Sequence, residues 1–150
     1  MIVKRYSLAL VKEPGIKYDG LNEKYDNAQK IFDLMCNVFH ADTLPEEHIW
    51  LVTLNNHMKL TGVSEVSMGT FDKTTVPIRE ILSRVLLSSA QCFLLVHNHP
   101  GGDQTPSVAD IDATKQIMSA AEILHLTMLD HIIVGDGFYT NIRNYIEEGF

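Results

Sequence analysis

The stretch that decides the fold runs from Phe93 to Ile111 and reads FLLVHNHPGGDQTPSVADI. Its first four residues are bulky and apolar, as in a buried strand, and they lead directly into His97. A loop rich in glycine and proline follows, and an amphipathic helical pattern then begins at Ile111 and continues to about Leu124. The order is therefore strand, loop and helix, with two histidines at the end of the strand and a serine and an aspartate at the start of the helix.

The two histidines, His97 and His99, are two positions apart. Residues i and i+2 of an extended chain point to the same side, so both imidazoles can converge on one point. Asp110, in the first turn of the helix, can present a carboxylate to that point because the Pro100–Gly102 corner lets the chain fold back. Two imidazoles, one carboxylate and an open position for water are typical of a catalytic zinc site.

Each of these residues also has a purely structural interpretation. A histidine at a strand end is more often a hydrogen-bonding residue than a ligand, in about four cases of five. Ser107 and Asp110 fit the S-x-x-D capping box and could simply begin a helix, whereas Thr105 with Pro106 is a rival helix start that would free them. The conjunction favours the metal site, because the four-residue pattern arises by chance in roughly one chain in a few thousand of this length.

Hydrophobic periodicity predicts further elements on both sides of this stretch. The predicted strands are 2–11, 48–54, 59–67, 92–97, 127–134 and 138–140, and the predicted helices are 26–39, one introduced by Pro77, 111–124 and a short last one ending near Gly149. Strands and helices alternate from residue 48 onward, which predicts a single α/β domain over residues 1–150 with helices packed on a mixed sheet. In such sheets ligands bind beyond the carboxyl ends of the strands, where His97 and His99 are expected.

The composition excludes several classes of protein. The 150 residues are 45% apolar and 21% charged, as in an ordinary soluble domain, and no apolar run approaches the roughly 18 residues of a membrane span. A net charge of −7 argues against strong binding of nucleic acid, which requires a basic face. Cys36 and Cys92 form no CxxC pair, so we expect buried free thiols. No signal-peptide pattern opens the chain, and we expect a cytoplasmic protein.

The spacing His-x-His, seven residues, Ser, two residues, Asp resembles the signature of the JAMM (MPN+, or JAB) metalloproteases. The wider chain resembles the RadC branch of that superfamily, through VSMGT at 66–70, REIL at 79–82, HNHPGGDQTPSVADIDATK at 97–115 and MLDHIIVGDG at 128–137. The resemblance implies a three-layer α-β-α domain of the JAB/MPN, cytidine-deaminase-like type.

This resemblance covers roughly residues 44–150. Residues 1–43, an expected strand and helix, resemble the prelude of short stand-alone members, and we expect no helix-hairpin-helix segment of the kind that longer RadC proteins carry. The chain has Gly101 where the family usually has serine, and its proline stands at 77 rather than directly before Arg79. Neither departure affects a predicted ligand.

The resemblance also implies roles for particular residues. His97, His99 and Asp110 would hold a zinc ion, and Ser107 would donate a hydrogen bond to the tetrahedral oxyanion. A glutamate ahead of the first strand of the domain would be the general base; by position this is Glu47, with its neighbour Glu46 as the rival. From the residues alone, the two glutamates are more simply a solvated acidic pair before a strand.

Other polar residues receive structural interpretations. Asp130 and His131 precede an apolar strand, and with no spacing that brings them to the metal we expect a structural hydrogen-bonded pair. Asp103 is expected to be a turn residue. Four more histidines show no ligand spacing and stay unassigned: His40, His48, His57 and His125.

The function implied by the resemblance is zinc-dependent hydrolysis of an amide or isopeptide bond in a peptide or protein substrate. Two alternatives remain: a docking module that keeps the metal without catalysis, and a nucleic-acid-processing protein associated with DNA repair, which the acidic composition disfavours. Neither the substrate nor the oligomeric state follows from the sequence, although an exposed edge at residues 2–11 could pair between chains.

Overall fold

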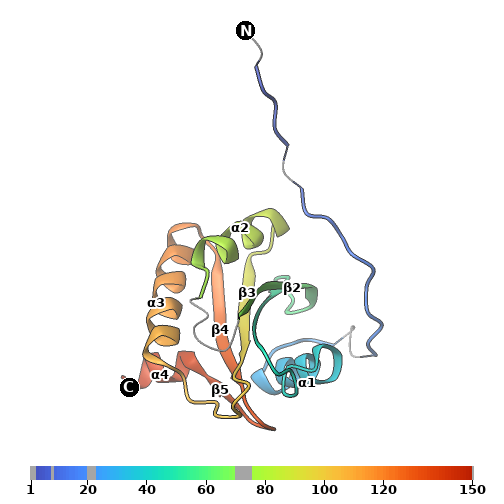
Figure 1. Ribbon diagram of the computed structural model, residues 1–150. Helices are drawn as coiled ribbons and strands as arrows, with labels where there is room; N and C mark the ends of the chain where they lie inside the picture. Colours follow the sequence, from blue (N-terminus) through green and yellow to red (C-terminus); the bar gives the residue numbers. More distant parts are fainter. Residues whose placement is uncertain (1–2, 8, 20–22, 70–75, 150) are drawn as a thin grey trace.

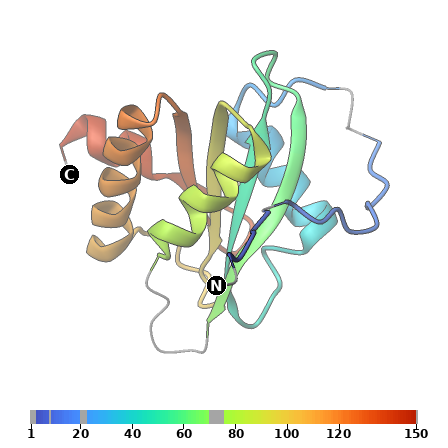
Figure 2. The ribbon, with the colours of Figure 1, turned by 90° about the horizontal axis from the view of Figure 1, so that it is seen from above.

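The computed structural model describes residues 3–7, 9–19, 23–69 and 76–149. Within these residues the chain forms a five-stranded sheet and four helices in three layers (Figures 1 and 2). The predicted α/β class with a mixed sheet is thereby confirmed. The elements in chain order are α1 (Ala28–Phe39), β1 (Glu47–Leu54), β2 (Leu60–Gly69), α2 (Ile78–Ser88), β3 (Cys92–Asn98), α3 (Val108–Ile123), β4 (Thr127–Val134), β5 (Tyr139–Asn141) and α4 (Ile142–Glu148).

The strand order in the sheet is β2-β1-β3-β4-β5, so β3 is the central strand. β1 pairs antiparallel with both β2 and β3, and β5 pairs antiparallel with β4. β3 and β4 are parallel, an arrangement that requires a crossover connection, and α3 provides it. In this register His97 lies at the carboxyl end of β3, opposite Ile49 of β1 and Ile133 of β4.

Helices cover both faces of the sheet. α1 packs on one face, whereas α2 and α3 pack on the other (Figure 1). Because successive side chains of a strand point to opposite faces, Leu94 and Val96 contact the α1 side and Phe93 and Leu95 the α2–α3 side. By the same alternation His97 points to the α2–α3 side and Asn98 to the α1 side, so these two neighbours point in opposite directions.

The start of α3 sets the position of Asp110. Ser107 is the N-cap: its hydroxyl accepts a hydrogen bond from the Asp110 backbone N–H, and the Asp110 carboxylate accepts one from the Ser107 N–H. The capping box is therefore present, and Thr105 with Pro106 as the helix start is wrong. Among the described helices none is long and apolar enough to cross a membrane; α3, the longest, has 16 residues where a span needs about 20.

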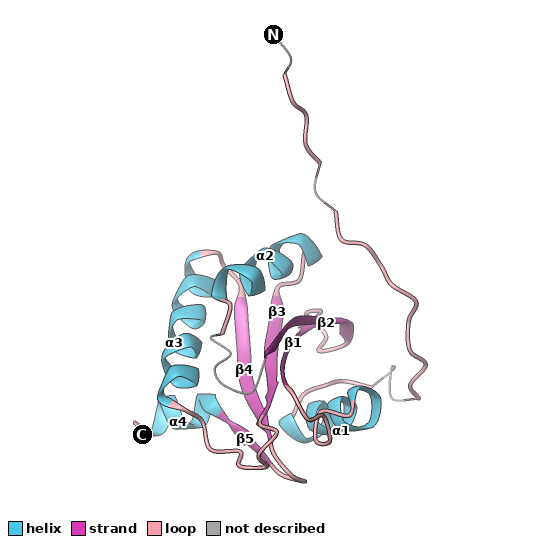
Figure 3. Ribbon diagram, viewed as in Figure 1, coloured by secondary structure: helices cyan, strands magenta, loops and turns pink. Residues whose placement is uncertain are grey.

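The predicted strand at 2–11 is wrong for the part of it that the structure describes, residues 3–7 and 9–11, while residues 2 and 8 lie outside the described residues. The described part forms neither helix nor strand and runs away from the sheet (Figure 3). Val3, Tyr6, Leu10 and Val11 alternate imperfectly and are all exposed. A strand requires a neighbour that accepts its backbone hydrogen bonds, and periodicity alone does not supply one.

The loop between β3 and α3 rests on the turn after β4. His99 N–H donates to the Val134 carbonyl at 2.9 Å, and Asp136 N–H donates to the Gly102 carbonyl at 3.2 Å. The approach is close because residue 135 is glycine: a Cβ at Gly135 would clash with the Gly102 carbonyl oxygen. This contact holds the loop that separates His99 from Asp110.

We therefore expect Gly135→Ala to destabilise the protein by about 1–3 kcal/mol, because the added methyl group must push the Gly102 carbonyl away. Urea denaturation of the purified variant measures the change. Gly101→Ala is the matched control, since a Cβ at Gly101 meets no atom within 4 Å. Equal stability of the two variants would contradict the close packing of loop and turn.

Candidate metal centre

The carboxyl end of β3 brings the two predicted histidine ligands together. The rings of His97 and His99 lie edge to face, with centroids 4.8 Å apart and planes at 88°. The His97 side chain is buried and the His99 side chain is partly open to solvent. The extended backbone of residues 97–99 therefore directs both imidazoles to one region, as their spacing predicts.

Asp110 joins them from the first turn of α3. Its Oδ1 lies 3.4 Å from His97 Nδ1, and its Oδ2 lies 3.6 Å from His99 Nε2. Burial by itself would raise the pKa of this carboxyl, but the interaction with His99, the charge of His97 and the two hydrogen bonds from Ser107 outweigh burial and lower it. Asp110 is thus an anion held beside both rings.

Ser107 is also in the site, with its hydroxyl directed at the carboxylate. Its Oγ donates to Asp110 Oδ2 at 2.7 Å, and its N–H donates to the same oxygen at 2.9 Å. The residue expected to donate to an oxyanion is therefore, in this structure, a hydrogen-bond donor to the predicted metal ligand.

Glu47, the first residue of β1, contacts His97 from the other side. Its Oε1 is hydrogen-bonded to His97 Nε2, and this bond lowers the pKa of the Glu47 carboxyl although burial opposes the shift. Glu46, its rival from the sequence, is exposed. The two glutamates are adjacent in sequence, but only Glu47 points into the sheet end where the histidines lie.

The side chain of Asn98 holds Glu47 in this place. Its amide N–H donates to the Glu46 carbonyl at 2.9 Å, and its carbonyl oxygen accepts from the His48 N–H at 2.6 Å. These two backbone groups flank Glu47 on either side. Asn98 is itself 1% exposed, so both bonds are shielded from water. The residue between the two histidines thus ties the start of β1 to the end of β3.

Within the described residues, one group of three or more His, Cys, Asp and Glu side chains has ligand atoms that converge: Glu47, His97 and His99, mutually within 4.8 Å. The predicted ligand Asp110 is not one of these three; it approaches the two imidazoles at His97 Nδ1 and His99 Nε2. The site therefore offers four donor side chains, two imidazoles and two carboxylates, with Glu47 and Asp110 on different sides of His97.

The hydrogen-bond partners of His99 favour a positive charge, from a proton or a metal ion, beside Asp110. Its Nδ1 lies 2.7 Å from the Asp103 carbonyl, which can only accept, so Nδ1 carries a proton. Its Nε2 then faces the Asp110 carboxylate at 3.6 Å, and two bare electron pairs would repel unless a proton or a metal ion lies between them. The pKa of His99 responds: burial lowers it, but Asp110 and the Asp103 carbonyl outweigh burial and raise it.

The side chains therefore fit a divalent metal. Two imidazoles and two carboxylates are the donors that zinc accepts, and a ligating histidine commonly donates its second N–H to a backbone carbonyl, as His99 does. Asp103 was expected to be only a turn residue. Its carboxylate does accept from the Thr105 N–H at 2.9 Å, yet its backbone carbonyl also sets the tautomer of His99.

His131 is the site residue that sequence reasoning missed. It is not among the convergent donors, but its ring centroid lies 5.8 Å from that of His97, which the spacing in the sequence does not indicate. It sits on β4, where the parallel register pairs it with Leu95, and it is wholly buried. The expected hydrogen-bonded pair with Asp130 is confirmed: Asp130 Oδ1 accepts from the His131 backbone N–H. The sequence signal, histidine in an apolar strand, does not reveal this register.

The remaining candidates lie elsewhere. His48 stacks on Trp50 with centroids 5.2 Å apart, and His40 and His125 have left-handed backbone conformations after α1 and α3.

Cys36 and Cys92 are free thiols, half-buried rather than buried. Burial raises the pKa of Cys36 to about 12, which removes it as a nucleophile at neutral pH.

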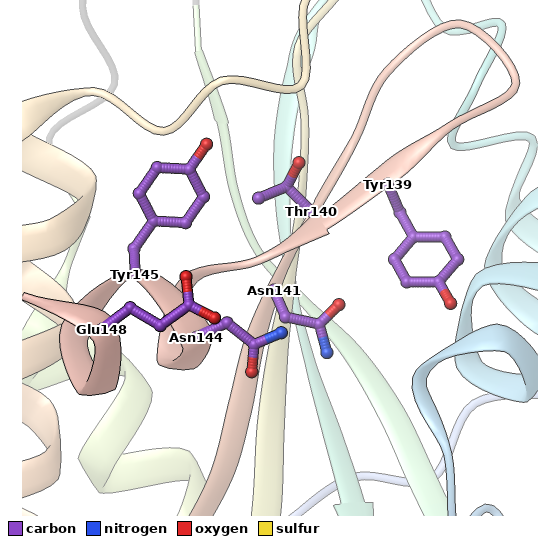
Figure 4. Close-up of a pocket in the computed structure, with 6 residues that line it drawn as sticks. All are labelled: Tyr139, Thr140, Asn141, Asn144, Tyr145 and Glu148. Carbon is purple, nitrogen blue, oxygen red and sulfur yellow. The ribbon is translucent and has the colours of Figure 1, made fainter. Parts of the chain in front are cut away.

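A separate hollow of about 420 Å³ lies along β5 and α4 (Figure 4). Tyrosine, threonine and asparagine side chains line it, with Glu148 as its single carboxylate. None of the histidines described above contributes to it. The side chains that could hold a metal ion are therefore at the end of β3 and not in this hollow.

A family model of the RadC-like JAB domain matches residues 25–147. The chain belongs to this family. The JAB domain is 40% identical over 97 residues to a UPF0758 protein of Desulforudis audaxviator, covering 65% of the chain and 42% of that relative. It is 41% identical over 97 residues to a UPF0758 protein of Coprothermobacter proteolyticus, covering 65% of the chain and 41% of the relative. The matches thus span about two fifths of the length of these curated relatives.

The role of Asn98 can be tested by removing its amide. We expect Asn98→Ala to lower the free energy of unfolding by about 1–3 kcal/mol, because the Glu46 carbonyl and the His48 N–H lose their shielded partner. Chemical denaturation measures the loss, and Asn56→Ala, in an exposed turn, is the control. A loss no greater than that of the control would contradict the role of Asn98 as the tie between β1 and β3.

The buried His131 predicts a pH dependence of stability. Burial lowers its pKa from an ordinary 6.5 to about 3, so the ring stays neutral in the folded chain and takes up a proton on unfolding. Its contribution to stability is therefore complete above about pH 6.5 and is lost as the pH falls towards about 3.

Without a bound metal, the protein should lose about 1.4 kcal/mol of stability per pH unit from this group across that range. His131→Phe should lack this part of the slope, and urea denaturation of both proteins from pH 7 to pH 4 measures the difference. Parallel pH profiles for wild type and variant would show that the ring is not held neutral.

Proposed function

We propose that this JAB domain is a zinc-dependent hydrolase that cleaves amide or isopeptide bonds in a peptide or protein. The observation that carries the proposal is the meeting of two imidazoles with two carboxylates at the end of β3, where His99 Nε2 faces the Asp110 carboxylate. Membership of the JAB family supports the same chemistry.

In this proposal His97, His99 and Asp110 hold the zinc ion. A zinc ion with an open position supplies a Lewis acid for the carbonyl and lowers the pKa of water to about 7. Glu47 is the general base: its carboxylate, with a lowered pKa, is ionised at neutral pH and can accept a proton from the attacking water. The same carboxyl then passes the proton to the departing amine.

The exposure of the side chains suggests the side from which a substrate approaches. His97 and Asp110 are 1% and 5% exposed, whereas Glu47 and His99 are each 20% exposed. Solvent and substrate therefore reach the site past Glu47 and His99. A base on the open side can exchange its proton with the substrate without entering the core.

Ser107 is proposed to stabilise the tetrahedral oxyanion by donating its hydroxyl proton. Its Oγ donates to Asp110 in this structure, so the hydroxyl must rotate towards the substrate during the reaction. Its backbone N–H stays with the Asp110 carboxylate, which keeps that anion hydrogen-bonded after the rotation.

The test compares two adjacent glutamates. Glu47→Gln should bind zinc like the wild type, measured by elemental analysis, and should lose hydrolysis by at least about 10²-fold, because the amide cannot take the proton. The probe is a fluorogenic peptide library that contains both α-peptide bonds and isopeptide bonds to lysine side chains. Glu46→Gln is the matched control, exposed and one residue away, and should behave as the wild type.

Asp110→Ala should bring the zinc content far below one ion per chain, while thermal stability falls only modestly.

Hydrolysis by Glu47→Gln at the wild-type rate would refute the role of Glu47 as the general base. Zinc binding without cleavage of any library member by the wild type would favour the metal-containing docking module instead.

A further inference from the structure

His131 has one ring nitrogen with a partner and one without. Its Nδ1 lies 2.7 Å from the Thr114 hydroxyl, which itself lies 2.6 Å from the Asp110 backbone carbonyl. A carbonyl can only accept, so the hydroxyl proton of Thr114 goes to Asp110 and its oxygen accepts from His131 Nδ1–H. This assignment makes His131 Nε2 a bare acceptor inside the protein.

His97 has the complementary group. In the described part of the chain three buried side-chain nitrogen or oxygen atoms have no hydrogen-bond partner, and two of them are His97 Nδ1 and His131 Nε2. The two rings lie within 22° of parallel with centroids 5.8 Å apart. Two imidazoles joined by an N–H···N bond of about 2.9 Å have centroids about 5 Å apart, so this separation allows the bond once the two nitrogens turn towards each other.

The proposed function requires a partner for that nitrogen. A histidine that binds a metal through one nitrogen nearly always donates the other N–H to an acceptor, which fixes the ring. His99 donates to the Asp103 carbonyl. The Nε2 of His97 faces Glu47 and the open side, so its Nδ1 must find an acceptor in the interior.

Asp110 Oδ1 is the competing acceptor, at 3.4 Å from His97 Nδ1. That separation is too long for a hydrogen bond. Both hydrogen bonds from Ser107 and the approach of His99 are to the other oxygen, Oδ2, and they hold the carboxylate in this position. His131 Nε2 has no hydrogen-bond partner among the described residues.

We infer that His131 is the positioning residue of the metal centre: its Nε2 accepts the Nδ1–H of His97 and thereby turns His97 Nε2 to the metal. The inference rests on the proposed function. The resulting chain runs from His97 through His131 and Thr114 to the backbone of Asp110, so it connects two proposed ligands that belong to different elements. Movement of α3 relative to β3 would break it.

The direct test is the tautomeric state of the two rings, read from imidazole ¹⁵N chemical shifts at pH 7.5 with and without zinc. We expect His131 to carry its proton on Nδ1 in both forms, and His97 to carry a proton on Nδ1 with zinc on Nε2. A proton on His131 Nε2, or zinc on His97 Nδ1, would overturn the inference.

Zinc affinity, measured by competition with a chromogenic chelator, tests the consequence. His131→Phe keeps a ring of similar size without an acceptor and should weaken zinc binding about 10- to 100-fold. Thr114→Val should give a smaller loss in the same direction, because His131 is then no longer held by its Nδ1–H. Wild-type affinity in both variants would overturn the inference.

Thr53→Val is the matched control, since Thr53 is a buried threonine of β1 whose hydroxyl donates to the Gly62 carbonyl. A structural role alone predicts that Thr53→Val and Thr114→Val lose similar stability and no affinity. If His131→Phe does not fold, the ¹⁵N shifts and Thr114→Val still decide. All of these measurements can be made without catalytic turnover. A protein that binds no zinc would refute the proposed function. The ¹⁵N shifts of the zinc-free chain would still show which nitrogen of His131 carries the proton.

Discussion

The pairing of β3 with a strand on each side is the constraint on which the rest of the structure depends. β1 meets it antiparallel and β4 meets it parallel, so the end of β3 lies beside the beginning of β1 and the end of β4. Glu47, His97 and the turn after Val134 come together for this reason. The buried Asn98 amide reinforces the arrangement with two hydrogen bonds to β1, at the point where the regular ladder stops.

The electrostatics of the site follow from that geometry. Two carboxylates with lowered pKa values lie next to two imidazoles, one of them buried, and burial opposes the charge of both acids. Such an arrangement is unfavourable without a cation, because each ionised group gives up solvation that its neighbours must replace. The backbone hydrogen bonds of the sheet, away from the site, keep the two carboxylates close together although both are poorly solvated.

Much of the fold could be predicted because most elements have a local signal. The strand at 127–134 is observed with the predicted ends, and α3 begins where the serine of the capping box stands. The N-terminal strand fails for the converse reason: residues 3–7 have strand-like composition but no neighbour to pair with in the described chain. Helix caps and apolar periods are properties of a few consecutive residues, whereas a strand also needs a partner from a distant part of the chain.

The sequence by itself determined the layered α/β class, the strand–loop–helix unit and the convergence of the His97 and His99 rings on one region. Each of these features depends on residues a few positions apart. Only the tertiary structure decided that Glu47 rather than Glu46 faces the site, that the Asp103 carbonyl sets the tautomer of His99, and that His131 lies beside His97. These facts depend on strand register and loop path. A shift of one residue in the register would turn each strand side chain to the opposite face, and no local pattern records which register is formed.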